Sequence, residues 1–212
     1  RGEVPLWVGV LGVPVCVVAG FAVAWWGLPG LFLGALGLYG VLSAAYSLWL
    51  KTVPLLDVLA LAGLYTVRIL AGGWATGIPL SGWFLTFAVF FFLSLAFLKR
   101  YVELRSTTEA HVPRRGYISG DEELVRTFGG VSGHLAVLVF VLYVNSPAVV
   151  PLYREPRWLW LSVPLLLYWM MRLWLVAHRG QMHEDPVAFV LRDGVSYAVA
   201  AGLLLVFMVA SL

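Results

Sequence analysis

Runs of about twenty apolar residues follow one another along nearly the whole chain, and this pattern constrains the fold more than any other feature. A run of this length fits one helix crossing the hydrocarbon core of a bilayer, at about 1.5 Å of rise per residue. Strands are excluded within the runs, because no alternation of polar and apolar residues recurs in them. We predict seven spans, each bounded by charge, Pro or Gly: 4–26, 30–50, 54–78, 81–98, 127–147, 158–177 and 187–211. The predicted fold class is an all-α, polytopic membrane helix bundle, with residues 1–212 as a single transmembrane domain.

The composition excludes several other classes of protein. Hydrophobic residues make up 61% of the chain and charged residues 12%, which rules out an ordinary soluble domain and a disordered chain. A net charge of +3 is too small to build a nucleic-acid-binding face. Cys16 is the single cysteine, so neither an internal disulfide nor a cysteine zinc site can form. The chain begins with Arg1 and has no leading signal peptide, so we expect it to be a piece of a longer protein.

The cations are distributed unevenly between the two ends of the predicted spans. Ten of them lie at or near four alternate helix ends: Arg1, Lys51, Lys99, Arg100, Arg105, Arg114, Arg115, Arg126, Arg179 and Arg192. The other ends receive only Arg154 and Arg157. Uncharged turns at 28–30, 77–79 and 145–147 connect spans at these ends, and we expect the three turns on one side. By the positive-inside rule the cationic ends are cytoplasmic, and we predict a multi-pass protein of the bacterial inner membrane with its polar site on that side.

Two sequence signals predict helix starts in the charged connections. Ser119 followed by Glu122 has the spacing of a capping box, and we expect a short amphipathic helix there that enters the fifth span. Asp185 and Pro186 combine an N-cap residue with a first-turn proline, which predicts the start of the last helix.

Arg68 is an ionisable residue inside the third predicted span. A charge at that depth costs roughly 2.5 to 3.5 kcal/mol on the insertion scale, so it requires a partner or a water-filled cavity. Asp57 and Tyr65 share its helix face, but Asp57 lies three turns away, about 16 Å along the axis, and cannot pair with it. Two readings remain open: contact with an anionic ligand in a cavity, or a structural pair with a neighbouring helix.

Two adjacent cations, Lys99 and Arg100, follow the fourth apolar run, and Glu103 shares a helix face with Lys99. Such a pair suits a phosphate or pyrophosphate, which Arg grips with two hydrogen bonds and Lys binds as a point charge. The alternative is ordinary anchoring of a helix end on anionic lipid, and the same alternative applies to Lys51.

Other polar residues carry weaker signals. His178, His183, Glu184 and Asp185 do not have the spacing of a metal site, and no paired-aspartate motif of the DxxD or DxxxD type occurs. His134, Asn145, Tyr168 and Arg172 lie inside spans and could line a cavity, although Arg172 could also reach the membrane surface.

The sequence resembles the UbiA superfamily of intramembrane prenyltransferases, and within it the branch similar to decaprenyl-phosphate phosphoribosyltransferase. The resemblance covers nearly the whole chain in order. It rests on 46–51 (YSLWLK), Leu56-Asp57-Val58 with Tyr65, Arg68 and 71–73, then 92–96 (FLSLA), 99–104 (KRYVEL), 115–117 (RGY), 184–187 (EDPV) and 191–193 (LRD).

The resemblance implies a nine-helix bundle around a cavity that opens laterally to lipid, with the seven spans as family helices three to nine. Members carry an Asn-Asp-x-x-Asp type motif after their second helix, which binds Mg²⁺ and a pyrophosphate. That motif is expected before Arg1, so we expect Mg²⁺ as cofactor of the full-length protein and no activity from this piece alone. Lys99 and Arg100 also stand where many members have a second Asp-rich motif. Cations in place of that motif resemble the pattern of the phosphoribosyl-transferring branch.

Carried over residue by residue, the resemblance implies phosphate contacts at Lys51, Arg68, Lys99 and Arg100. Neighbours of the polar head group would be Asp57, Tyr65, Glu103, Tyr117, Asp185 and Arg192. The implied function is transfer of phosphoribosyl from phosphoribosyl pyrophosphate to a polyprenyl phosphate. Prenyl transfer from a polyprenyl diphosphate to an aromatic or other small acceptor is the alternative, and a transporter or lipid-binding protein without chemistry is a third. The expected partners are an isoprenoid lipid, a small phosphorylated co-substrate and membrane lipids, with no nucleic acid, and similar proteins also occur behind a soluble phosphatase-like domain.

Overall fold

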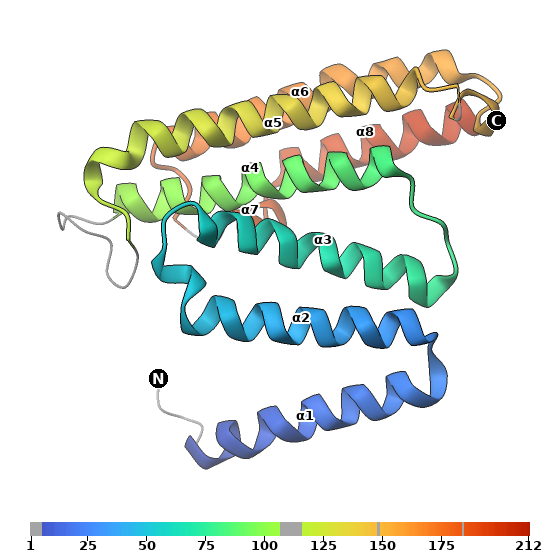
Figure 1. Cartoon of the computed structure of the whole chain (residues 1–212). Helices are drawn as coiled ribbons and strands as arrows, with labels where there is room; N and C mark the ends of the chain where they lie inside the picture. The colour runs from blue at the N-terminus through green and yellow to red at the C-terminus, as the bar shows by residue number, and fades with distance from the viewer. Residues whose placement is uncertain (1–5, 107–115, 148, 184) are drawn as a thin grey trace.

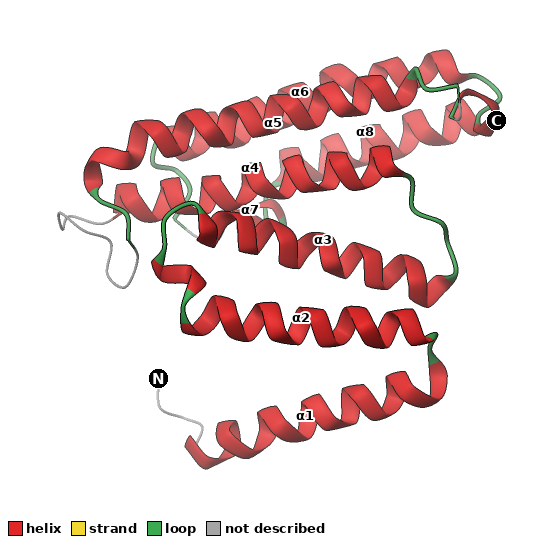
Figure 2. Ribbon diagram, viewed as in Figure 1, coloured by secondary structure: helices red, strands yellow, loops and turns green. Residues whose placement is uncertain are grey.

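The computed structural model describes residues 6–106, 116–147, 149–183 and 185–212, and within them all regular structure is helical (Figures 1 and 2). The α-helices, in chain order, are α1 (Leu6–Gly27), α2 (Gly30–Leu48), α3 (Leu56–Thr76), α4 (Gly82–Ser106), α5 (Glu122–Val144), α6 (Ser162–His178), α7 (Pro186–Val190) and α8 (Gly194–Ser211). Short 3-10 helices lie at Leu50–Thr52 (η1), Ser119–Asp121 (η2), Val150–Leu152 (η3) and Pro156–Leu161 (η4).

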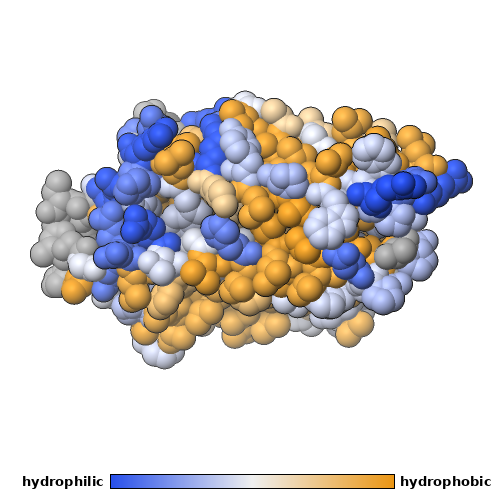
Figure 3. Space-filling model, turned by 90° about the horizontal axis from the view of Figure 1, so that it is seen from above, coloured by the Kyte–Doolittle hydropathy of each residue, from blue (hydrophilic) through white to orange (hydrophobic). Residues whose placement is uncertain are grey.

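The helices have the length and composition of membrane spans. Six segments in the described part are long and apolar enough to cross a bilayer, among them the continuous stretch Pro156–His178 formed by η4 and α6. The described side chains of α1 cover Leu11–Gly27, an equally apolar but shorter piece. Figure 3 shows a hydrophobic middle with hydrophilic residues towards both ends. The chain is therefore a polytopic all-α membrane bundle, as the sequence predicts.

The connections divide between the two ends of the bundle. The α1–α2, α3–α4 and α5–α6 connections lie at one end, and the α2–α3, α4–α5 and α6–α7 connections at the other (Figure 1). The three uncharged turns thus share one side, as predicted, and the cation-rich connections gather on the opposite side, called here the charged end.

Three predicted boundaries are corrected by the structure. Helix α4 continues to Ser106, so Lys99 to Glu103 are helical. The helix expected from Ser119 is, in the described residues, the 3-10 turn η2, which runs directly into α5 as its first turn, and the capping hydrogen bond there joins Ile118 N to Asp121 rather than Ser119 to Glu122. Asp185 and Pro186 begin the short helix α7, whereas the last span begins at Gly194 with Asp193 as its N-cap. The predicted span 187–211 is therefore broken in two.

The tightest helix packing lies where α4, α5 and α6 meet. Ser94 on α4 donates to the carbonyl oxygen of Gly129 on α5 at 2.7 Å, and the indole nitrogen of Trp174 on α6 donates to Ser94 Oγ at 3.2 Å. A Cβ atom at Gly129 would lie 2.3 Å from Trp174 Cζ2 and 2.7 Å from Phe97 Cβ. Small residues allow this close approach, which in lipid replaces the hydrophobic driving force.

We predict that Gly129→Ala destabilises the protein by about 1 to 3 kcal/mol, the usual cost of overpacking a filled core. Its matched control is Gly130→Ala, because a Cβ atom there meets nothing within 4 Å, and Ala favours a helix over Gly by about 1 kcal/mol. The measurement is reversible unfolding of both variants in mixed detergent micelles. Equal stability of the two variants would contradict the packing of α4, α5 and α6 described here.

Candidate functional site

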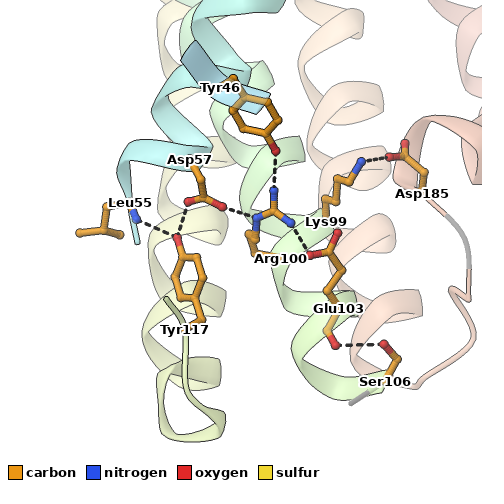
Figure 4. A network of polar contacts seen from close by, with 9 residues as sticks. All are labelled: Tyr46, Leu55, Asp57, Lys99, Arg100, Glu103, Ser106, Tyr117 and Asp185. Atoms are coloured by element: carbon orange, nitrogen blue, oxygen red, sulfur yellow. Dashed lines mark hydrogen bonds and ion pairs between the residues drawn. The ribbon is translucent and has the colours of Figure 1, made fainter. Parts of the chain in front are cut away.

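A buried ion pair between α3 and α4 forms the centre of the polar network at the charged end (Figure 4). Asp57 in the first turn of α3 is 0% exposed, and Arg100 in α4 is 1% exposed. Arg100 Nε donates to Asp57 Oδ2, Nη1 donates to Glu103 Oε2, and Nη2 donates to the hydroxyl of Tyr46 at 2.9 Å. Each of the three guanidinium nitrogens therefore has an acceptor within the protein.

Tyr117 completes this network from the segment that precedes α5. Its hydroxyl donates to Asp57 Oδ1 at 2.8 Å and accepts from the backbone nitrogen of Leu55 at 2.9 Å. Leu55 has a φ of 67°, a backbone conformation that costs a non-glycine residue about 1 to 3 kcal/mol. The hydrogen bond that Leu55 donates to Tyr117 thus stabilises a strained turn directly before α3.

Gly116 brings Tyr117 into position. A Cβ atom at Gly116 would lie 2.4 Å from Pro54 Cδ and 2.7 Å from the carbonyl oxygen of Thr52, so only glycine allows this approach. Burial raises the pKa of Tyr117, the hydrogen bond from Leu55 lowers it, and the negative charge of Asp57 raises it further, so the net shift is upward. The hydroxyl therefore stays protonated and remains a donor to Asp57.

Lys99 forms a second, more accessible ion pair next to this network. Its Nζ lies 2.6 Å from Asp185 Oδ2, and the two side chains are 35% and 36% exposed. Asp185 also caps α7 by accepting from the nitrogen of Val187 at 2.9 Å. Burial alone would raise the pKa of Asp185, but the hydrogen bonds from Lys99 and Val187 bring it below its ordinary value.

The Lys99 pair lies at a narrow, mostly apolar pocket between α3, α4 and α7. The pocket is lined by Leu61, Tyr65, Leu95, Ala96, Lys99, Asp185, Pro186 and Val187. Its volume is only about 20 Å³, so an anionic head group would meet the half-exposed cation at the mouth of the pocket, with a hydrophobic chain against the apolar residues beside it. We call this feature the Lys99 pocket.

A third ion pair involves Arg172. The sequence allowed its side chain either to line a cavity or to reach the membrane surface. Its Nη1 and Nη2 donate to the two carboxylate oxygens of Asp193 at 2.7 and 2.9 Å. Asp193 caps α8 by accepting from the nitrogen of Ser196 at 2.8 Å. Burial alone would raise the pKa of Asp193, but the bonds from Arg172 and Ser196 bring it below its ordinary value. This pair joins α6 to the start of α8.

The structure divides the residues that the sequence singled out into separate groups. Asp57, Arg100, Glu103 and Tyr117 form one network, and Tyr65, Lys99 and Asp185 line the Lys99 pocket. Lys51 in η1 lies at the same end of the bundle, between α2 and α3, whereas Arg192 follows α7 next to the Asp193–Arg172 pair. Arg68 stands apart, at a groove between α2 and α3, where it donates to the hydroxyl of Tyr39. Arg114, Arg115 and Glu184 lie outside the described residues.

Phosphate contact by Arg100 stays a prediction, since in this structure its donors already serve Asp57, Glu103 and Tyr46. Three polar partners were not among the predicted site residues: Tyr39, Tyr46 and Asp193. The two tyrosines lie within an apolar run, where nothing in the spacing marks them. Asp193 had a usable signal, because Asp is one of the residues preferred at the N-cap of a helix.

The described carboxylates do not make a metal site. No group of three His, Cys, Asp or Glu side chains comes together in the part of the chain that the structure describes. Asp57, Asp185 and Asp193 are each committed to a cation on another helix. His178, considered above for a metal, instead shares a 2.9 Å hydrogen bond through Nδ1 with the hydroxyl of Tyr101. These residues therefore do not fit a Mg²⁺ ion, and no step is assigned to one.

Comparison with known proteins supplies the family. Residues 1–194 match the UbiA prenyltransferase family. The uncharacterized protein y4nM of Sinorhizobium fredii is 36% identical over 81% of this chain and 34% of its own length. The nodulation protein NoeC of Azorhizobium caulinodans is 34% identical over 79% of this chain and 55% of its own length.

A third kind of relative is matched over a shorter stretch. Decaprenyl-phosphate phosphoribosyltransferase of Mycobacterium tuberculosis is 37% identical over 49% of this chain and 34% of its own length. The chain thus spans between about a third and about half of the relatives it matches. The match over residues 1–194 and the bundle of apolar helices lead to one conclusion: this chain belongs to the UbiA prenyltransferase family of multi-pass membrane proteins.

Proposed function

We propose that this chain is part of a membrane transferase that moves phosphoribosyl from phosphoribosyl pyrophosphate to a polyprenyl phosphate. The observation that carries the proposal is the Lys99 pocket, where a half-exposed cation lies beside apolar walls at the charged end. The similarity to decaprenyl-phosphate phosphoribosyltransferase, which extends over 49% of the chain, supports the choice of reaction.

In the proposed reaction, an oxygen of the lipid phosphate forms a bond to C1 of the ribose as the bond from C1 to the pyrophosphate oxygen breaks. The pyrophosphate leaves with that electron pair. The protein's part is to hold the two reactants in line and to offset negative charge. Lys99 contacts a phosphate as a point charge, and Lys51 adds positive charge at the same end.

The Arg100 network has a different role in this proposal. Asp57, Glu103 and Tyr117 hold Arg100 between α3 and α4, which fixes the two helices that form one wall of the Lys99 pocket. Arg100 is therefore a positioning residue in the proposed mechanism. Mg²⁺ remains expected from the family resemblance, and the cationic end is proposed to face the cytoplasm of a bacterial inner membrane.

A second candidate function is prenyl transfer from a polyprenyl diphosphate to a small acceptor. It is favoured by the match of residues 1–194 to a family of prenyltransferases. In this reaction the lipid carries the leaving pyrophosphate, and Lys99 would contact that group.

One experiment separates the two reactions. The full-length protein in lipid nanodiscs is given labelled phosphoribosyl pyrophosphate with farnesyl phosphate, and in a parallel sample labelled farnesyl diphosphate with 4-hydroxybenzoate as a representative aromatic acceptor. We expect labelled lipid only in the first sample, dependent on farnesyl phosphate. Product in the second sample alone would assign prenyl transfer, and product in neither would overturn the proposal of a transferase acting on these classes of substrate.

A further inference from the structure

Arg68 lies in a groove between α2 and α3, separate from the polar networks at the charged end. The groove is lined by Phe32, Ala35, Leu36, Tyr39, Val67, Arg68, Ala71 and Gly72. None of these residues is acidic, and Arg68 is exposed rather than buried. The groove therefore presents one positive charge between apolar walls.

The depth of Arg68 keeps it away from the Arg100 network. Arg68 follows Asp57 by eleven residues on α3, a rise of roughly 16 Å along the helix axis. Its partner Tyr39 precedes Tyr46 by seven residues on α2, or roughly 10 Å. Both helices thus place the Arg68 groove near the middle of the bundle, whereas Asp57 and Tyr46 lie at the charged end.

The described partners of Arg68 are neutral. Its Nη2 donates to the hydroxyl of Tyr39, and its Cζ lies 5.0 Å from the ring centre of Tyr39 and 5.1 Å from that of Tyr65. Cation–π contacts stabilise the guanidinium, but they leave its charge in place. Arg100, by contrast, lies between two carboxylates. A guanidinium inside a span with only neutral partners is complementary to an anion.

Tyr65 connects this groove to the Lys99 pocket. Its ring contacts Arg68, stacks on Phe92 of α4 at 4.9 Å between ring centres, and also lines the Lys99 pocket. The two cations, Arg68 and Lys99, therefore lie beside one face of α3 at two different depths.

We propose that Arg68, Tyr39 and Tyr65 form a second anion-binding site, deeper in the membrane than the Lys99 pocket, which holds the phosphate of an isoprenoid phosphate. The planar guanidinium offers two parallel donors to phosphate oxygens, and the hydroxyl of Tyr39 offers a third. The apolar walls of the groove cover the first isoprene units. The choice of an isoprenoid chain rests on the proposed function, whereas the anion site rests on the charge and depth of Arg68.

The test is the number of farnesyl phosphate molecules bound by the full-length protein in phosphatidylcholine nanodiscs. We expect two saturable sites in the unchanged protein and one in Arg68→Gln. Lys99→Met should also keep one site, and that site should be the one at Arg68. Tyr39→Phe, which keeps the ring and removes only the hydroxyl, should weaken the Arg68 site several-fold, and farnesol should not compete for it.

The matched control is Arg157→Gln, a cation at the opposite end whose side chain is 80% exposed, and it should keep both sites. Melting temperatures establish whether each variant is folded. If Arg68→Gln does not fold, the affinity of Tyr39→Phe for farnesyl phosphate tests the proposal. Two sites in Arg68→Gln, or two sites of unchanged affinity in Tyr39→Phe, would overturn the proposal, as would equal competition by phosphatidylglycerol. Binding is measured without turnover, so failure of the transfer assay leaves this result unaffected.

Discussion

Arg100→Ala is expected to lower the free energy of unfolding by roughly 3 to 5 kcal/mol, the largest stability effect of any single substitution proposed here. The reason is that Asp57 is 0% exposed and would be left buried without its cation. The remaining hydrogen bond from Tyr117 offsets only part of that cost. Reversible unfolding in mixed detergent micelles measures the effect.

A double-mutant cycle makes this result specific to the pair. Asp57→Ala and Arg100→Ala together should destabilise the protein by less than the sum of the two single variants, because neither charge is then left unpaired. Arg157→Ala serves as control, since its partner Glu155 lies on the surface and exposed substitutions cost within about 0.5 kcal/mol. An Arg100→Ala variant as stable as the control would contradict the role of Arg100 as the partner of a buried carboxylate.

Lys99→Met is expected to lower kcat/KM of the full-length transferase by about 100-fold, the size of effect that follows removal of one preorganised donor to a developing charge. The physical reason is that Lys99 is the half-exposed cation of its pocket and is proposed to contact a phosphate. Lys99→Arg retains the charge and should retain most of the activity. Initial rates with limiting lipid phosphate provide the measurement.

Asp185→Asn separates phosphate contact from a purely structural role of Lys99. Asn caps a helix about as well as Asp, so this change keeps the start of α7 and removes only the ion pair. If Lys99 served only to hold α7, Asp185→Asn would lose as much activity as Lys99→Met. The proposal instead expects Asp185→Asn to stay within a few-fold of the unchanged protein, with Arg179→Gln as an exposed-cation control.

The positions of the helices followed from local information. Each apolar run had the length of a bilayer crossing, and charge, Pro and Gly marked the connections, so the bundle and the grouping of its ends were predictable. The prediction was wrong between residues 187 and 194, where the apolar run continues through a break. Helix α7 ends at Val190, and Asp193 caps the start of α8 while it pairs with Arg172 on α6, a contact 21 residues distant in sequence that hydropathy does not register.

The sequence by itself determined that this chain spans a membrane many times and collects its cations at one end. Only the tertiary structure decided which polar residues meet: Arg100 with Tyr46, 54 residues away, and Lys99 with Asp185, 86 residues away. The physical reason is that a membrane helix is apolar both where it faces lipid and where it packs against other helices. The hydrophobic periodicity that reveals the buried face of a soluble helix is therefore weak. The rotation of each helix, and with it the separation of Arg68 from Arg100, is fixed by close packing between helices.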